Sequence, residues 1–259
     1  MIAALPMYDF PWVRAATDRL WATIRDALRA QGVGAPEALT RDGDLHEIWA
    51  DSGLLLGQTC GYPYWTGLRR QAEILATPIY GFAGCEGANH RSFLIARRDD
   101  ARAELGEFRG VRAAVNSFDS NSGMNLFRAS VAPLANGKPF FADVVETGGH
   151  ARSLAAIVEE RADIAAIDCV TFALLARGAS RLVAATKIVG ETQSSPALPF
   201  IVSRALPQEA RSAVRRALRD LPPVPELGLA GVAFLPETAY ARVAEIEREA
   251  QRLGYPRLA

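Results

Sequence analysis

Short apolar runs alternate with amphipathic segments along most of this chain of 259 residues. The run MIAAL (1–5) predicts a first strand. From Pro11 to Ala30, apolar residues from Trp12 to Leu28 recur every fourth position, which predicts a helix with one buried face. Such segments bury their apolar surface only by packing in layers. The alternation therefore predicts an α/β protein.

Further apolar runs predict more strands, at residues 53–58, 72–82, 91–98, 111–116, 141–147 and 162–168. Helical periods predict helices at 148–161, at 210–221 and after Pro236. Between the last two, LPPVPELGLAG (221–231) is rich in proline and glycine, which predicts a connector. The long apolar stretches near 91–97 and 182–203 mark where the chain could pass between two lobes and return.

The charge of the chain excludes some partners. Its 29 basic and 29 acidic residues balance, and no block of like charge occurs. Nucleic acid and anionic membranes are therefore not expected as partners. No apolar run approaches the roughly 18 to 20 residues that span a bilayer, so no membrane span is predicted.

The first residues, MIAALPMYDF, lack the basic start, apolar stretch and cleavage site of a secretory signal. If Met1 is the natural first residue, the sequence predicts a cytoplasmic protein. If a signal peptide preceded it and was removed, the protein is periplasmic.

Three cysteines, Cys60, Cys85 and Cys169, have no spacing typical of a zinc site or a redox Cys-x-x-Cys pair. No metal site is expected. The favoured interpretation is three reduced thiols. A Cys60–Cys85 bridge and a catalytic thiol are the alternatives.

Small polar residues follow several of the predicted strands, at the end of the sheet where open α/β proteins bind ligands. The segments are PMYD, QTCGY, SFDSNSG, TGGH, DCVT and GETQSSP. They predict a ligand site built from strand ends.

SNSG (residues 120–123) precedes an amphipathic segment. A helix start offers unpaired amide N–H groups and a partial positive charge, so small residues there let an anion approach. Ser120 and Ser122 would add hydroxyl donors, and Gly123 would leave room. The alternative is an ordinary N-cap. The repetition at other strand ends favours the ligand site.

Two ionisable residues lie at similar positions. His150 begins a predicted helix and could donate to an oxyanion, or it could be a solvated or capping side chain. Asp168 ends a strand; it could accept from an amine or hydroxyl of the ligand, or simply cap a helix. As a site residue, Asp168 would repel a bare dianion.

The segments VRAAVNSFDSNSGMNLFR, TGGHARSLAAIVEERADIAAID and LGLAGVAFLPETAY resemble the solute-binding proteins of phosphate, phosphite and phosphonate ABC importers. The resemblance implies a type 2 periplasmic-binding-protein fold. In this fold two lobes, each a mixed sheet flanked by helices, are joined by two crossing hinge strands and close on ligand. Lobe 1 would comprise 1–97 and 186–259, and lobe 2 would comprise 98–185.

The resemblance also assigns site residues. Ser120, Asn121, Ser122 and His150 would face the oxyanion beside Gly123, and Asp168 would face the rest of the ligand. Lobe 1 would contribute Tyr8, Thr59 and Tyr62.

Two classes of function remain open, because a fold alone does not decide function. The favoured one is a monomeric binding protein that takes a small anion or zwitterion between its lobes, without metal or cofactor, for an ABC permease. The alternative is a cytoplasmic enzyme similar to menaquinone- or thiamine-pyrimidine-pathway enzymes, using Cys60, Cys169, Asp168 and His150. A stand-alone ligand sensor is a third interpretation.

Overall fold

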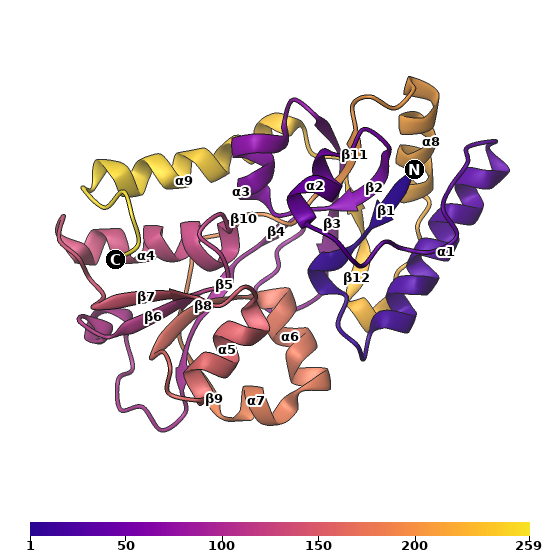
Figure 1. Ribbon diagram of the computed structural model, residues 1–259. Coiled ribbons are helices and arrows are strands. Elements are labelled where there is room, and N and C mark those ends of the chain that lie inside the picture. The colour runs from indigo at the N-terminus through magenta and orange to yellow at the C-terminus, as the bar shows by residue number, and fades with distance from the viewer. The chain divides into compact units, whose positions relative to one another are not determined.

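The computed structural model describes residues 1–259, and the chain forms two compact units. Unit 1 consists of Met1–Gly81, Glu86–Ala88 and Pro196–Ala239. Unit 2 consists of Phe82–Cys85, Asn89–Ser195 and Tyr240–Ala259. Each unit holds a five-stranded sheet with its own helices (Figure 1). The prediction of an α/β fold with mixed sheets is confirmed.

The sheet of unit 1 has the order β1-β2-β11-β3-β12. Its strands are β1 (Ile2–Ala4), β2 (Leu54–Gln58), β3 (Ala72–Tyr80), β11 (Phe200–Ser203) and β12 (Leu229–Ala233). β1 and β2 are parallel, whereas β11 runs antiparallel to both of its neighbours. Leu54, Leu55 and Leu56 are fully buried, so β2 lies in the core of this unit.

Helices cover the sheet of unit 1. They are η1 (Pro6–Tyr8), α1 (Arg14–Ala30), α2 (Leu45–Ala50), α3 (Gly61–Pro63), η2 (Tyr64–Leu68), α8 (Gln208–Arg219) and η5 (Pro225–Leu227). α1 packs against α8, and α8 packs on β2, β3 and β12. Trp12, predicted to be buried on the first helix, is 40% exposed and stacks on Phe10. α1 begins only at Arg14, so Trp12 precedes the helix.

The sheet of unit 2 has the order β7-β6-β8-β5-β9. Its strands are β5 (Ser92–Arg97), β6 (Arg112–Val115), β7 (Asp143–Glu146), β8 (Ile164–Asp168) and β9 (Thr186–Glu191). β6 is parallel to β7 and β8, and β5 is antiparallel to β8 and β9. The sheet therefore has one reversed strand, β5, whereas the sheet of unit 1 has two, β11 and β12.

The helices of unit 2 lie on both faces of its sheet, with α4 and α9 on one face and α5, α6 and α7 on the other (Figure 1). They are η3 (Leu105–Phe108), η4 (Asn121–Asn125), α4 (Leu126–Ala135), α5 (His150–Val158), α6 (Cys169–Gly178), α7 (Ser180–Ala184) and α9 (Ala241–Arg252). The short strands β4 (Asn89–His90) and β10 (Ser195–Pro196) pair with each other, and η6 (Glu237–Tyr240) precedes α9.

The division into units differs from the predicted boundaries at 97/98 and 185/186. β5 and β9 pair in the sheet of unit 2, so the second unit begins earlier and ends later than predicted. α9 also belongs to unit 2, because it packs on α4.

The predicted connector at 221–231 is also corrected in part. Its last residues begin β12, which pairs antiparallel with β3. Proline and glycine in this segment therefore precede and enter a strand rather than only linking two helices. No helix of the chain is both long and apolar enough to cross a membrane.

Candidate functional site

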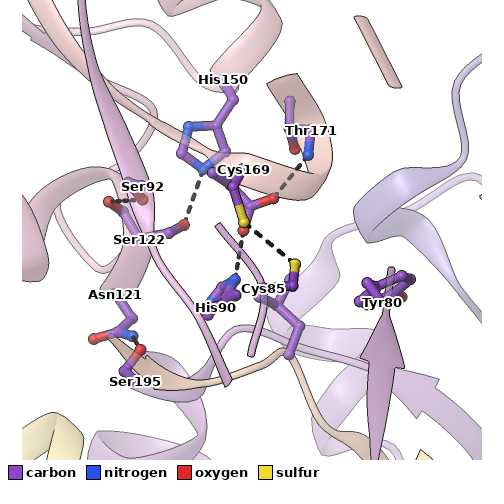
Figure 2. Close-up of polar contacts among 12 residues, drawn as sticks. Tyr80, Cys85, His90, Ser92, Asn121, Ser122, His150, Cys169, Thr171 and Ser195 are labelled. Atoms are coloured by element: carbon purple, nitrogen blue, oxygen red, sulfur yellow. Dashed lines mark hydrogen bonds and ion pairs between the residues drawn. The ribbon is translucent and has the colours of Figure 1, made fainter. Parts of the chain in front are cut away.

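The candidate site lies at one edge of the sheet of unit 2. β6, β7 and β8 are parallel, so their carboxyl ends meet at that edge. The start of η4, the start of α5 and the start of α6 follow these ends. As a result Ser122, His150 and Asp168, which are far apart in the sequence, gather in one cluster, in which Ser122 and Asp168 are buried and His150 is half-buried. Figure 2 shows Ser122 beside His150.

The first two residues of the SNSG element hold the helix start in place. Ser120 is the N-cap of η4, and its Oγ accepts a hydrogen bond of 3.0 Å from the Gly123 amide. Asn121 donates through Nδ2 to Ser195 Oγ at 2.9 Å and accepts through Oδ1 from Asn125 Nδ2 at 3.0 Å. The N-cap interpretation therefore describes Ser120, and Asn121 belongs to an internal amide network.

Gly123 makes room for a protein group. A Cβ at this position would lie 1.7 Å from Asn116 Oδ1 and 3.1 Å from His150 Cε1. No other residue type fits without moving Asn116. The buried Asn116 Oδ1 accepts no hydrogen bond, so an acceptor oxygen, rather than open space, lies over the glycine.

Ser122 and His150 form the first polar pair of the cluster. Ser122 Oγ lies 2.9 Å from His150 Nε2, and the Ser122 carbonyl accepts from Ser92 Oγ at 2.8 Å. Burial lowers the pKa of His150, outweighing the attraction of Asp168; nearby His90 lowers it further. His150 is therefore a neutral imidazole at neutral pH, with one N–H to donate.

His90 and Asp168 form the second pair. His90 Nδ1 lies 2.7 Å from Asp168 Oδ2, and both side chains are almost completely buried. Burial raises the pKa of Asp168, but the charge and hydrogen bond of His90 outweigh it and hold this pKa below its usual value. Burial likewise lowers the pKa of His90, and Asp168 more than reverses this, so the pKa is raised. The two side chains form a charged pair.

Each member of this pair has a further polar atom. Asp168 Oδ1 accepts a hydrogen bond of 2.8 Å from the Thr171 amide, so the carboxylate also caps α6. His90 Nε2 is buried and has no hydrogen-bond partner in the protein. The ion pair with Asp168 therefore keeps the His90 ring charged, and the Nε2–H on the other side of the ring can donate to an acceptor.

Sequence reasoning missed His90, because it considered only residues that follow strands. β5 is antiparallel to β8, and Ser92 pairs with Asp168. The beginning of β5 therefore lies at the same edge as the ends of β6 and β8. The only signal in the sequence is a histidine three residues before the apolar run FLIA, in ANHRSFLIA. This signal points to the site only when the strand is known to be reversed.

The other predicted site residues belong to unit 1. Tyr8 is buried and packs edge-on against Tyr80, with ring centroids 5.3 Å apart. The Thr59 amide donates to the Pro199 carbonyl at 3.2 Å. Tyr62 lies in α3 and is half-buried. Their roles toward a ligand stay predictions.

The cysteines are all free thiols, and Cys85 does not pair with Cys60. Instead, Cys85 Sγ lies 3.4 Å from Cys169 Sγ. A hydrogen bond with the Cys85 thiol and burial raise the pKa of Cys169, so Cys169 is protonated as long as the Cys85 thiol is its partner. No group of three or more His, Cys, Asp or Glu side chains is arranged to hold a metal ion.

A known protein family matches most of this chain. The family described as ABC transporter, phosphonate, periplasmic substrate-binding protein matches residues 53–248. No curated protein matches the chain.

Three solved structures are similar over nearly the whole chain. A binding protein component of an ABC phosphonate transporter from Pseudomonas aeruginosa has a TM-score of 0.78 at 14% identity, covering 97% of this chain and 87% of that one. PhnD1 from Prochlorococcus marinus in complex with methylphosphonate has a TM-score of 0.75 at 9% identity, covering 97% and 98%. A Xanthomonas citri protein bound to chloride ion has a TM-score of 0.72 at 16% identity, covering 97% and 98%. At such identities the likeness establishes the fold, which is the predicted two-lobed periplasmic-binding-protein fold.

Proposed function

This chain belongs to the family of periplasmic substrate-binding proteins of phosphonate ABC transporters, and we propose that it binds a small phosphonate-like oxyanion at the buried cluster of unit 2. The observation that carries the proposal is the convergence of Ser122, His150 and His90 at one sheet edge. Two hydrogen-bond donors, the Ser122 hydroxyl and the His90 imidazolium, suit the oxygens of a phosphonate, and His150 orients the hydroxyl.

His90 resolves an electrostatic difficulty. Asp168 alone would repel a dianion, but its charge is offset by the imidazolium of His90 at 2.7 Å. The ligand would meet the Nε2–H of His90, with Asp168 behind the ring. In a buried site such a charge-assisted hydrogen bond is stronger than at the surface.

Ser122 and His150 act together in this proposal. When His150 Nε2–H donates to Ser122 Oγ, the serine O–H is released to donate to a ligand oxygen. A bound anion also favours protonation of His150, whose pKa burial has lowered. Binding therefore takes up a proton, and affinity rises as the pH falls toward the region where free histidine titrates, about 6.5.

The first test is calorimetric titration with methylphosphonate. Ser122→Ala removes one donor to a charged ligand, so the dissociation constant should rise roughly 10-fold or more, the effect of about 1.5 to 3 kcal/mol. Ser130→Ala is the matched control, because Ser130 Oγ only bonds the Leu126 carbonyl within α4. Equal affinity in wild type and Ser122→Ala would rule out this placement of the ligand.

A second arm separates binding from catalysis. Methylphosphonate recovered from the protein after prolonged incubation should have an unchanged mass. A changed mass that depends on His150 and Asp168 would favour the enzyme interpretation.

We extend the proposal to compartment and assembly. The protein acts in the periplasm as a monomer and delivers its ligand to an ABC permease. The membership of a periplasmic transport family supports this. Light scattering coupled to size exclusion, with and without methylphosphonate, should give the mass of one chain, and a stable dimer would contradict it.

A further inference from the structure

We propose that Cys85 and Cys169 form a reversible disulfide that fastens the turn 82–85 to the start of α6, beside Asp168. Cys85 Sγ and Cys169 Sγ lie 3.4 Å apart within unit 2 (Figure 2). A bond of about 2.0 Å requires the sulfur atoms to approach by roughly a further 1.4 Å.

The backbone around Cys85 is already packed against its partner. Gly84 has φ +87°, and a Cβ there would lie 2.8 Å from Cys169 Cβ. The Cys85 amide closes the turn by donating to the Phe82 carbonyl at 3.1 Å. At the other end of α6, the Arg177 guanidinium lies 4.7 Å from the centre of the Phe82 ring. The turn is therefore held on α6 at two points, one of them the sulfur pair.

The two thiols differ in the way that disulfide exchange requires. Cys85 is half-exposed, and its hydrogen bond with the Cys169 thiol lowers its pKa. Cys169 is buried, with a raised pKa. Cys85 is therefore the thiol that meets an external oxidant, and Cys169 is the one that resolves the intermediate.

The oxidant is a small disulfide such as oxidised glutathione. The Cys85 thiolate attacks one sulfur of it, forming a mixed disulfide and releasing one glutathione thiolate. Cys169 then loses its proton and attacks Cys85 Sγ, which releases the second glutathione. Two protein thiols are oxidised and one glutathione disulfide is reduced to two thiols. In an oxidising compartment such as the periplasm, where disulfides persist, the disulfide of an oxidising protein would exchange with Cys85 by the same two steps.

The test is oxidation of the folded full chain with oxidised glutathione, followed by thiol titration under denaturing, acid-quenched conditions. The Cys60→Ser variant lacks the third thiol, so oxidation should lower its thiol count from two to none. Its mass should fall by that of two hydrogen atoms, and digestion should give a linked peptide pair containing Cys85 and Cys169. The melting temperature should rise by several degrees and return on reduction. Cys85→Ser/Cys60→Ser is the control, and its one buried thiol should stay reduced and its melting temperature unchanged.

Two thiols remaining in oxidised Cys60→Ser would overturn the proposal, as would glutathione retained on Cys85. Neither readout uses phosphonate, so the outcome is independent of the proposed ligand.

Discussion

The two units share a sheet design but differ in what they bury. Each has a five-stranded mixed sheet, with two reversed strands, β11 and β12, in unit 1 and one, β5, in unit 2. Unit 1 buries only neutral polar side chains, which are Thr17, Gln58, Thr59, Thr77 and Ser203. Unit 2 buries His90, Arg128 and Asp168 in addition to serines and asparagines.

The difference shows that unit 2 alone bears the cost of burying charged side chains. A buried charge is costly unless it is paired and hydrogen-bonded. Unit 2 accepts this cost at the sheet edge where His90 and Asp168 meet, and again where Arg128 joins α4 to the end of the chain. Unit 1 has no such pair in its core. Three measurements test this comparison.

The largest effect is expected from Asp168→Asn. The amide can still accept from the Thr171 amide and cap α6, so the change removes the charge while keeping the cap. His90 then loses its counterion, and the free energy of unfolding should fall by about 3 to 5 kcal/mol. Urea unfolding measures it.

Asp44→Asn is the matched control in unit 1. Asp44 caps α2 through the His46 and Glu47 amides and is exposed. A loss within about 0.5 kcal/mol is expected there. Similar losses of unfolding free energy in the two variants would show that the buried pair of unit 2 stabilises the fold no more than an exposed helix cap does.

Arg128→Met should give the next largest effect. Arg128 donates to Asn125 Oδ1 at 2.7 Å and to the Pro256 carbonyl at 2.8 Å, and faces Glu247. Methionine leaves these acceptors without a donor, at a cost of about 2 to 3 kcal/mol. Denaturant unfolding of this variant should show the loss.

Arg19→Met tests an ion pair of unit 1 in which both side chains are more than half exposed, Arg19 with Glu226. Such surface pairs contribute about 0 to 1 kcal/mol. A larger loss from Arg19→Met than from Arg128→Met would reverse the comparison.

The smallest effect is a pH dependence of stability. The raised pKa of His90 stabilises the fold fully below its unfolded pKa of about 6.5, and this is lost as the pH rises through the raised value. The lowered pKa of Asp168 stabilises the fold above about pH 3.9, and this is lost as the pH falls through the lowered value. The lowered pKa of His150 works against stability below about pH 6.5.

His90→Gln should therefore lose the decline in stability that wild type shows above about pH 6.5. Melting curves between pH 6 and pH 9 compare the two proteins. Parallel curves would mean that His90 is not charged in the folded state.

Much of the fold was predictable from local patterns. The runs at 53–58, 111–116 and 162–168 became β2, β6 and β8, because short apolar runs bounded by polar residues have few other ways to bury themselves. The predicted helix at 148–161 became α5, because its apolar residues recur with the period of a helix and bury one face. The run at 91–98 also became a strand, β5, but the unit to which β5 and β9 belong depends on distant partners, because β5 pairs with β8 and with β9.

Part of the candidate site was predictable as well. Ser122, His150 and Asp168 follow strand ends, and parallel strands bring their ends together, so their convergence follows from a rule that the sequence can express. Ser120 and Asn121 occur at the predicted place with their side chains bonded within the protein. A sequence does not record which donors are already occupied.

By itself, the sequence determined the α/β class, most strands and helices, and the position of the polar residues at strand ends, because these depend on neighbours within a few residues. Only the tertiary structure decided that β5 is reversed, which brings His90 to Asp168 and Cys85 to Cys169. Strand direction within a sheet is set by long-range pairing, and the charges and thiols that meet at the site depend on that direction.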